Sequence, residues 1–254
     1  MKVLTFFNHA GGAGKSTLTR DIGYTLSQQG LRVLLIELDP QGNLSSWLGV
    51  FDVSGAQTVA ETAVNNAPLP QPLQVFGMHL IPSNLDLAMA ENRMTGSIGS
   101  QLNLRERVRE WSERYDLVLI DSPPSLGNLT VMGAVAADHL IVPVPTRDKG
   151  LRGLKGVTSA VTSYRRLNPG LNVALFVPTL YDARTRHDQD NLQTMRTMLH
   201  PLASPLRYRA ATWNDSCTAG QPLGLYAPNS EAYSDVLQLA REVLDAIGME
   251  VPHA

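Results

Sequence analysis

The chain has 254 residues, of which 43% are hydrophobic and 17% charged, a composition typical of a folded globular protein. Its single cysteine, Cys217, excludes a disulfide within the chain and any cysteine cage for zinc or an iron–sulfur cluster. The net charge of −2 conceals an asymmetry: residues 145–215 carry 11 Lys and Arg against 5 Asp and Glu, whereas the remainder carries 10 against 18. Charge alone leaves open whether this is an ordinary surface or a basic face that meets phosphates.

Short apolar runs at 3–7, 33–38, 117–120 and 140–144 predict buried parallel strands, and two more strands are expected at 80–81 and 173–177. Helical spacing predicts helices over 17–29, 102–114, 150–167, 191–199 and 231–247. This alternation predicts one α/β domain over 1–254, with a mostly parallel twisted sheet and helices on both faces. Such a sheet binds ligands at the carboxyl ends of its strands. The proline-rich segment 67–77 is expected to be a surface loop.

A glycine-rich segment directly follows the first predicted strand. It fits the pattern G-x-x-x-x-G-K-[ST] with His9 in place of the first glycine, and the variant K-G-G-x-G-K-[ST] with Ala10 in place of the first lysine. Small residues let backbone N–H groups turn toward phosphates, and the following helix directs its positive end at the same anion. We therefore predict a phosphate-binding loop formed by Gly11, Gly12, Ala13, Gly14, Lys15, Ser16 and Thr17, with Lys15 on the β- and γ-phosphates and Ser16 on Mg²⁺.

Acidic residues follow two other predicted strands. Asp39 lies in the motif E-L-D-P-Q-G-N after the second strand, and Asp121 closes the strand that precedes S-P-P-S. Carboxylates at the ends of buried strands beside a phosphate loop are where Mg²⁺ and its waters need them.

These three motifs together resemble the ParA/MinD family of deviant Walker ATPases. The resemblance covers nearly the whole chain, since A-A-D-H-L-I-V-P-V at 136–144, T-L-Y-D-A-R-T at 179–185 and Y-A-P-N-S at 226–230 are also similar to family segments. It implies a P-loop NTPase fold and slow hydrolysis of ATP with Mg²⁺. It further implies a homodimer that sandwiches two nucleotides, binds DNA without sequence preference or binds a membrane, and is released by a partner protein that stimulates hydrolysis.

The resemblance also implies residue roles. Lys15 is the phosphate lysine, Asp39 orients the attacking water, and Asp121 is the outer Mg²⁺ carboxylate, while Ser16 binds the ion directly. Phosphoryl transfer needs chiefly positioning and charge neutralisation, so this sparse set is chemically sufficient.

Ala10 is the main departure from the family pattern, because the lysine expected there reaches the partner's nucleotide. The chain has four lysines: Lys2, Lys15, Lys149 and Lys155. Lys149 lies in the loop after the strand at 140–144. A chain that lacks the early lysine and has a lysine in its second half resembles the carboxysome-positioning McdA branch. We hypothesise that Lys149 acts in trans, with Lys155 and Arg147 as alternatives and a solvated loop residue as the plain interpretation.

Smaller departures concern Glu37, which replaces the usual aspartate, and Ala210, which stands where relatives often have asparagine, so adenine contacts at 208–211 stay open. His9 is interpreted as a turn residue with a partnered ring nitrogen. Trp47, Trp111 and Trp213 are interpreted as packing residues, although Trp47 lies close enough to Asp39 in sequence to report nucleotide binding.

Arginines and lysines of the basic region are the candidates for DNA contacts. The resemblance assigns DNA binding to Arg184 and, less directly, to Arg209. The wider candidates also include Arg165, Arg166 and Arg207, and the residues that we predict to contact DNA are Arg152, Lys155, Arg184, Arg186 and Arg209. Contacts of this kind give salt-sensitive, sequence-independent binding.

Two other function classes compete with a DNA-bound positioning ATPase. A MinD-like membrane regulator needs a basic amphipathic tail, but the helix at 231–247 carries mainly acids beside one arginine. A small-molecule P-loop enzyme is not excluded by motif. No signal peptide or apolar run near the ~20 residues of a membrane span is visible, so we expect a cytoplasmic, nucleoid-associated protein with a ParB-like or McdB-like adaptor and no membrane contact.

Overall fold

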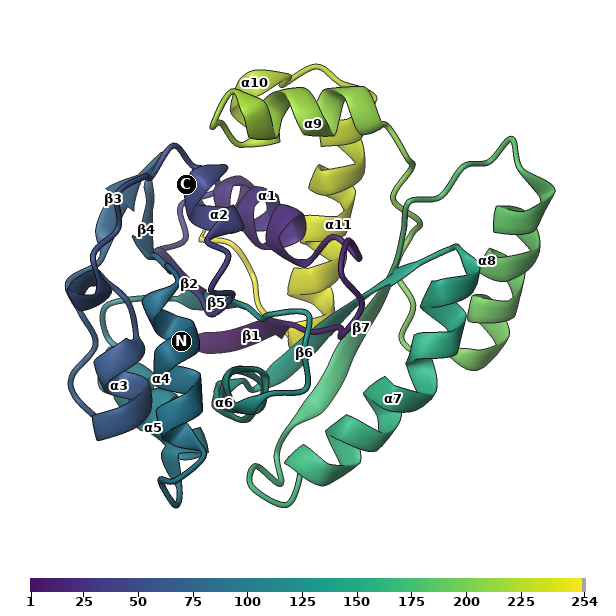
Figure 1. The fold of residues 1–254 in the computed structure, drawn as a ribbon. Helices are drawn as coiled ribbons and strands as arrows, with labels where there is room; N and C mark the ends of the chain where they lie inside the picture. The colour runs from purple at the N-terminus through teal and green to yellow at the C-terminus, as the bar shows by residue number, and fades with distance from the viewer. Residues whose placement is uncertain (253–254) are drawn as a thin grey trace.

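The computed structural model describes the backbone of residues 1–252, and the side chains in that range except those of residues 148–153 and 155. A seven-stranded sheet with the order β3-β4-β2-β5-β1-β6-β7 forms its centre (Figure 1). The strands are β1 (Lys2–Phe6), β2 (Val33–Glu37), β3 (Leu73–Val75), β4 (Met78–Ile81), β5 (Leu117–Asp121), β6 (His139–Pro145) and β7 (Asn172–Thr179). All neighbouring pairs are parallel except β3 with β4, so the predicted α/β sheet is confirmed.

Helices connect these strands. They are α1 (Lys15–Gln28), α2 (Asn43–Ser46), α3 (Ala60–Asn65), α4 (Asp86–Met94), α5 (Asn103–Arg109), α6 (Asn128–Ala136), α7 (Asp148–Tyr164), α8 (Arg186–Met198), α9 (Ala210–Thr218), α10 (Leu223–Tyr226) and α11 (Glu231–Ile247), with short 3₁₀ turns at Gly55–Gln57 and Ser100–Leu102. None of the described helices is both long and apolar enough to cross a membrane.

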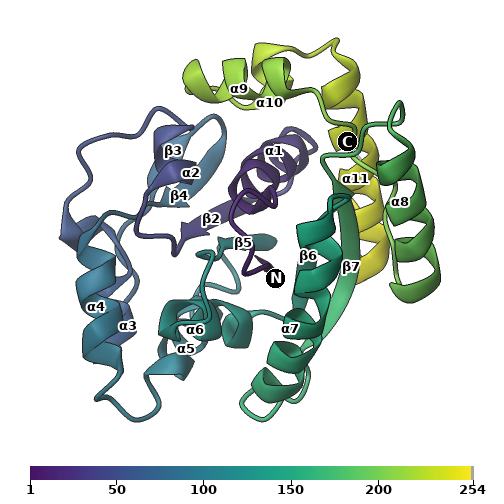
Figure 2. The same ribbon diagram turned by 45° about the vertical axis from the view of Figure 1, so that its right-hand side comes forward.

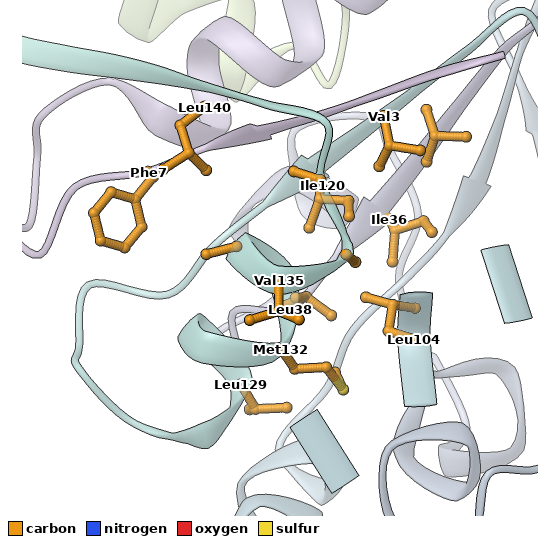
Figure 3. Close-up of a cluster of buried hydrophobic side chains, with 14 of the residues drawn as sticks. Val3, Phe7, Ile36, Leu38, Leu104, Ile120, Leu129, Met132, Val135 and Leu140 are labelled. Carbon is orange, nitrogen blue, oxygen red and sulfur yellow. The ribbon is translucent and has the colours of Figure 1, made fainter. Parts of the chain in front are cut away.

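Two hydrophobic clusters cover the two faces of the sheet. On one face, α1 and α11 contribute Leu18, Ile22 and Val243 to a cluster with Leu35 and Leu119. On the other face, side chains of α5 and α6 meet those of β1, β2 and β5; Figure 3 shows this cluster, in which Leu104, Leu129, Met132 and Val135 gather near Val3, Ile36, Leu38 and Ile120. The strands are therefore buried on both sides, which explains why β2 and β5 are continuous apolar runs.

The prediction of a surface loop over 67–77 is wrong for the last part of that segment. Leu73–Val75 forms the antiparallel edge strand β3, paired with β4 through a tight turn at Phe76 and Gly77. Both turn residues have positive φ (48° and 81°), the geometry of a two-residue hairpin turn. The sequence does not reveal the hairpin because prolines dominate the preceding residues.

Helix α6 is not indicated by helical spacing either. Seven of its nine residues are buried, so apolar side chains occur all around it and no polar face marks its period. In contrast, α11 has a clear apolar stripe. Ser230 caps its start, where the Ser230 hydroxyl accepts the Tyr233 N–H at 3.1 Å, and the left-handed Gly248 caps its end.

Candidate nucleotide site

The glycine-rich loop joins β1 to α1 at the carboxyl edge of the sheet. Gly12 and Gly14 have φ of 71° and 101°, a left-handed backbone that favours glycine. Three side-chain hydrogen bonds fix the loop in place. Asn8 Nδ2 donates to the Pro143 carbonyl at 2.6 Å, Asn8 Oδ1 accepts the Ala10 N–H at 2.9 Å, and Thr179 Oγ1 donates to the Ala13 carbonyl at 2.9 Å. Residues of β6 and β7 therefore hold in place the loop that connects β1 to α1.

A cleft of about 390 Å³ lies over this loop. Its floor is the loop and the start of α1, and Asp39, Gln41, Asn43 and Trp47 line one side. A second group, here called the α9 wall, consists of Leu206, Arg207, Tyr208, Ala210, Trp213 and Asn214, and Pro124 and Thr179 also line the cleft. The predicted loop residues 11–17 and Asp39 are thus brought together, as their motifs require.

Lys15 is the buried cation of the cleft. The residue is 6% exposed, and its Nζ donates to the Ala10 carbonyl at 3.3 Å, across the loop. Burial lowers the pKa of Lys15, while the charges of Asp121 and Asp39 oppose that shift. An anion bound in the loop would restore the electrostatic compensation that burial removes.

Asp121 ends β5 in the centre of the sheet, in register with Phe6 of β1 and Glu37 of β2. Its carboxylate is fully buried, and neither oxygen has a hydrogen bond of normal geometry from the described residues. Burial raises the pKa of Asp121 to about 7, although the nearby Ser16 hydroxyl and Lys15 ammonium oppose the shift.

These orphaned oxygens beside Ser16 fit a magnesium ion that binds mainly through phosphate and water. No cluster of three or more His, Cys, Asp or Glu suited to a metal occurs among the described residues. Within the described part of the chain, a magnesium ion here would take most of its ligands from phosphate and water.

Asp39 and Glu37 have different tasks. Asp39 is 7% exposed and lines the cleft, and its carboxylate accepts the Gln41 N–H at 3.0 Å. Glu37 is fully buried and accepts the backbone N–H groups of Leu44 at 2.7 Å and Ser45 at 3.1 Å, together with the Ser45 hydroxyl. Burial, followed by the charge of Asp121, raises the pKa of Glu37 to about 8. Glu37 thus fixes the start of α2 and the segment that carries Asp39.

The sequence does not indicate that the α9 wall lines the cleft. Ala210, Trp213 and Asn214 lie at i, i+3 and i+4 on α9, so one helix face lines the cleft. Tyr208 lies beside them with Arg147 over its ring at 4.9 Å. Trp47 and Trp213 both line the cleft, so their interpretation as packing residues is incomplete. The only sequence signal is the open question of adenine contacts at 208–211.

His9 differs from its interpretation as a turn residue with a partnered nitrogen. Neither ring nitrogen has a hydrogen-bond partner among the side chains and backbone that the structure describes. The ring instead packs edge-on against Phe7, with centroids 5.8 Å apart, and lies against Gly156 of α7, where a Cβ would approach Nε2 to 2.5 Å.

The predicted DNA contacts fall into three groups. Arg184 is highly exposed and pairs with Asp182 at 2.8 Å, and the exposed Arg186 begins α8. Arg209 pairs with Glu231 beside the Arg207–Asp235 ion pair, so its charge is partly neutralised. The side chains of Lys149, Arg152 and Lys155 lie outside the described ones.

Loop, sheet and acids together define a P-loop nucleotide-binding fold. A family described as "AAA domain" matches residues 1–173. "Probable plasmid-partitioning protein ParA" of Thermus thermophilus is 42% identical over 97% of this chain and 79% of its own length. The chain therefore belongs to the AAA-domain family, in its ParA-like group of deviant Walker ATPases.

Solved structures carry the same fold. Cobyrinic acid a,c-diamide synthase from Mycobacterium smegmatis, with bound ADP and magnesium, has a TM-score of 0.83 and 30% identity, covering 100% of this chain and 99% of its own. The ATP complex of a McdA variant from Cyanothece has a TM-score of 0.87 over 100% of this chain and 99% of its own. At 23% identity, the McdA likeness concerns the fold alone.

Because the raised pKa of Asp121 means that the folded state holds a proton the unfolded state releases, stability falls as pH rises from about 4 through about 7. The D121N variant lacks this loss. In urea unfolding without nucleotide, we expect D121N to exceed the wild type at pH 8 by on the order of 1–3 kcal/mol and to lose this advantage toward pH 4. An advantage that did not change with pH would contradict the assignment.

Proposed function

We propose that this chain is an ATP- and Mg²⁺-dependent positioning ATPase. In the proposal, the ATP-bound chain forms a nucleotide-sandwich homodimer that binds DNA without sequence preference, and an adaptor protein that stimulates hydrolysis releases it. The cargo distributed over the nucleoid is a plasmid, a chromosome or a carboxysome-like organelle. The observation that supports it best is the convergence of Lys15, Ser16 and Asp39 on one cleft above the glycine-rich loop, with the buried carboxylate of Asp121 beside Lys15 and Ser16.

Each residue has a chemical task in this proposal. The N–H groups of 11–17 and the Lys15 ammonium hold the phosphates, while Ser16 and Asp121 hold the ion and its waters. When bound, Mg²⁺ would neutralise charge on the transferred phosphate. Asp39, already oriented by the Gln41 N–H, directs the attacking water.

The D39A variant should separate binding from hydrolysis. Removing this carboxylate leaves the loop intact, so ATP affinity should stay within about threefold while turnover falls at least roughly tenfold. Phosphate release and equilibrium ATP binding are the measurements. K15A should lose both activities, and D190A, an exposed acid on α8, should lose neither. A D39A enzyme with normal turnover would remove Asp39 from this role.

Lys149 is proposed to reach the partner's nucleotide in place of the lysine absent at Ala10. The alternative Arg147 already lies over Tyr208 of its own chain, which favours a different residue for the task. We expect K149A to bind ATP as a monomer but to fail in ATP-dependent dimerisation, measured by light scattering after size exclusion. Unchanged dimerisation and hydrolysis in K149A would refute this role, and R147A and K155A test the alternatives.

DNA binding is tested on random-sequence duplex without nucleotide, with ADP, with ATP and with a slowly hydrolysed analogue. We expect binding only with ATP or the analogue, and a roughly tenfold loss in R184A/R186A with a salt slope smaller by about 2. R105A/R114A, with Arg105 on α5, a helix that lies away from α8 in Figure 2, removes two arginines elsewhere and is the control. ATP binding without DNA binding in any state would instead favour a membrane regulator or a small-molecule enzyme.

A further inference from the structure

A buried ion pair lies in the second turn of α1, outside the cleft. Arg20 and Asp21 have side chains that are 0% exposed, with Arg20 Nη2 at 2.9 Å from Asp21 Oδ2 and Nε at 3.2 Å from Oδ1. Burying two charges costs free energy that the pair recovers only with good geometry and further hydrogen bonds. Such a pair is therefore strongly directional, and its other partners decide what it holds.

Those partners lie on α9 and α10, about 200 residues further along the chain. Arg20 Nη2 donates to Ser216 Oγ at 2.8 Å, and Nη1 lies 3.2 Å from Cys217 Sγ. Asp21 Oδ1 accepts the N–H of Leu223, the first residue of α10, at 2.7 Å. The pair thus joins the helix of the phosphate loop to a segment that only tertiary structure places beside it.

The chain of contacts continues to the cleft. Ser216 Oγ, which accepts from Arg20, donates to the Trp213 carbonyl at 2.9 Å, and Trp213 lines the cleft with Asn214. Next to this segment, Gly220 lies against Gly49, where an added Cβ at Gly220 would come within 3.3 Å of Gly49 backbone. The residues just after α9 therefore also contact the turn that follows Trp47.

The two ends of the cleft differ in chemistry. The glycine-rich loop and Lys15 offer N–H groups and a cation, which suit phosphates, whereas Trp47, Tyr208 and Trp213 bring aromatic side chains to the lining, which suit a base. Lys15 begins α1 only five residues before Arg20. Helix α1 thus carries the phosphate lysine at its start and, in its second turn, the ion pair that bonds to α9 and α10.

We propose that Arg20 and Asp21 are positioning residues. They hold the α9 wall of the cleft at the distance from the phosphate loop that a nucleoside needs. This inference rests on the nucleotide binding proposed above. It predicts that loosening the wall weakens ligands that span the cleft and spares ligands that occupy the loop alone.

The S216A variant tests this most gently, because it leaves both charges paired and removes only the bonds of one hydroxyl, that from Arg20 and that to the Trp213 carbonyl. We expect the dissociation constant for Mg-ATP to rise roughly tenfold, the effect of one hydrogen bond to a charged group. Binding of Mg-tripolyphosphate, which lacks the nucleoside, should change less than twofold. S27A is the control, since the Ser27 hydroxyl donates to the Tyr24 carbonyl of its own helix and, among the described residues, forms no bond with α9 or α10. Calorimetric titration of each variant with both ligands measures these constants.

The R20M/D21N variant removes both charges, while the amide oxygen introduced at position 21 still offers an acceptor to the Leu223 N–H. We expect it to weaken Mg-ATP more than S216A does and again to spare tripolyphosphate, at temperatures where thermal unfolding shows a folded protein. Equal weakening of both ligands would indicate general damage to α1 and overturn the proposal. So would wild-type ATP affinity in both variants. Failure of the wild type to bind Mg-ATP would instead reject the proposed function.

Discussion

The carboxylate of Asp121 is the constraint around which this edge of the sheet is built. It ends a central strand, is fully buried and lies in register with a second buried acid, Glu37. Burial raises the pKa of both groups, and the charge of Asp121 adds to the shift of Glu37. Among the described side chains, Lys15 brings positive charge near Asp121, and burial lowers the pKa of Lys15. Without nucleotide, the buried carboxylate of Asp121 therefore lacks compensating positive charge, which a divalent ion bound with phosphate would supply.

The neighbouring acid Glu37, in contrast, has its hydrogen-bond partners within the protein. Its oxygens accept two backbone N–H groups at the start of α2 and the Ser45 hydroxyl, so its buried polar atoms are satisfied. The Asp121 oxygens have no such partners among the described groups. Of two neighbouring acids, one serves the backbone and the other is left for a ligand, and the different environments of a similar pair of side chains produce the different roles.

The parts of the site that the sequence could predict are those in which each motif follows its own strand. Gly11 to Thr17, Asp39 and Asp121 each come at or directly after the end of an apolar run, and parallel pairing brings the three strand ends to one edge. The α9 wall could not be predicted this way, because Trp213 and Asn214 are placed at the cleft by tertiary contacts of α9 and its neighbours, including the bonds to Arg20 of α1 and the packing of Trp213 against the cluster that contains Leu223. Thr179 and Asn8 escaped prediction for the same reason, since their bonds to the loop cross between β6, β7 and β1.

Helix α1 gives these separate observations a common mechanical basis. Its first residue is the cation of the phosphate end, and its second turn holds, through Arg20 and Asp21, the helix that forms the aromatic end. A rigid helix fixes the spacing of its residues at about 1.5 Å each, so neither end of the cleft can shift freely relative to the other. Hydrophobic side chains could hold α9 against α1 with equal strength, but they would not fix its rotation, whereas a forked guanidinium does. A site that must accept a whole nucleotide therefore gains geometric definition from a buried ion pair that contributes little net stability.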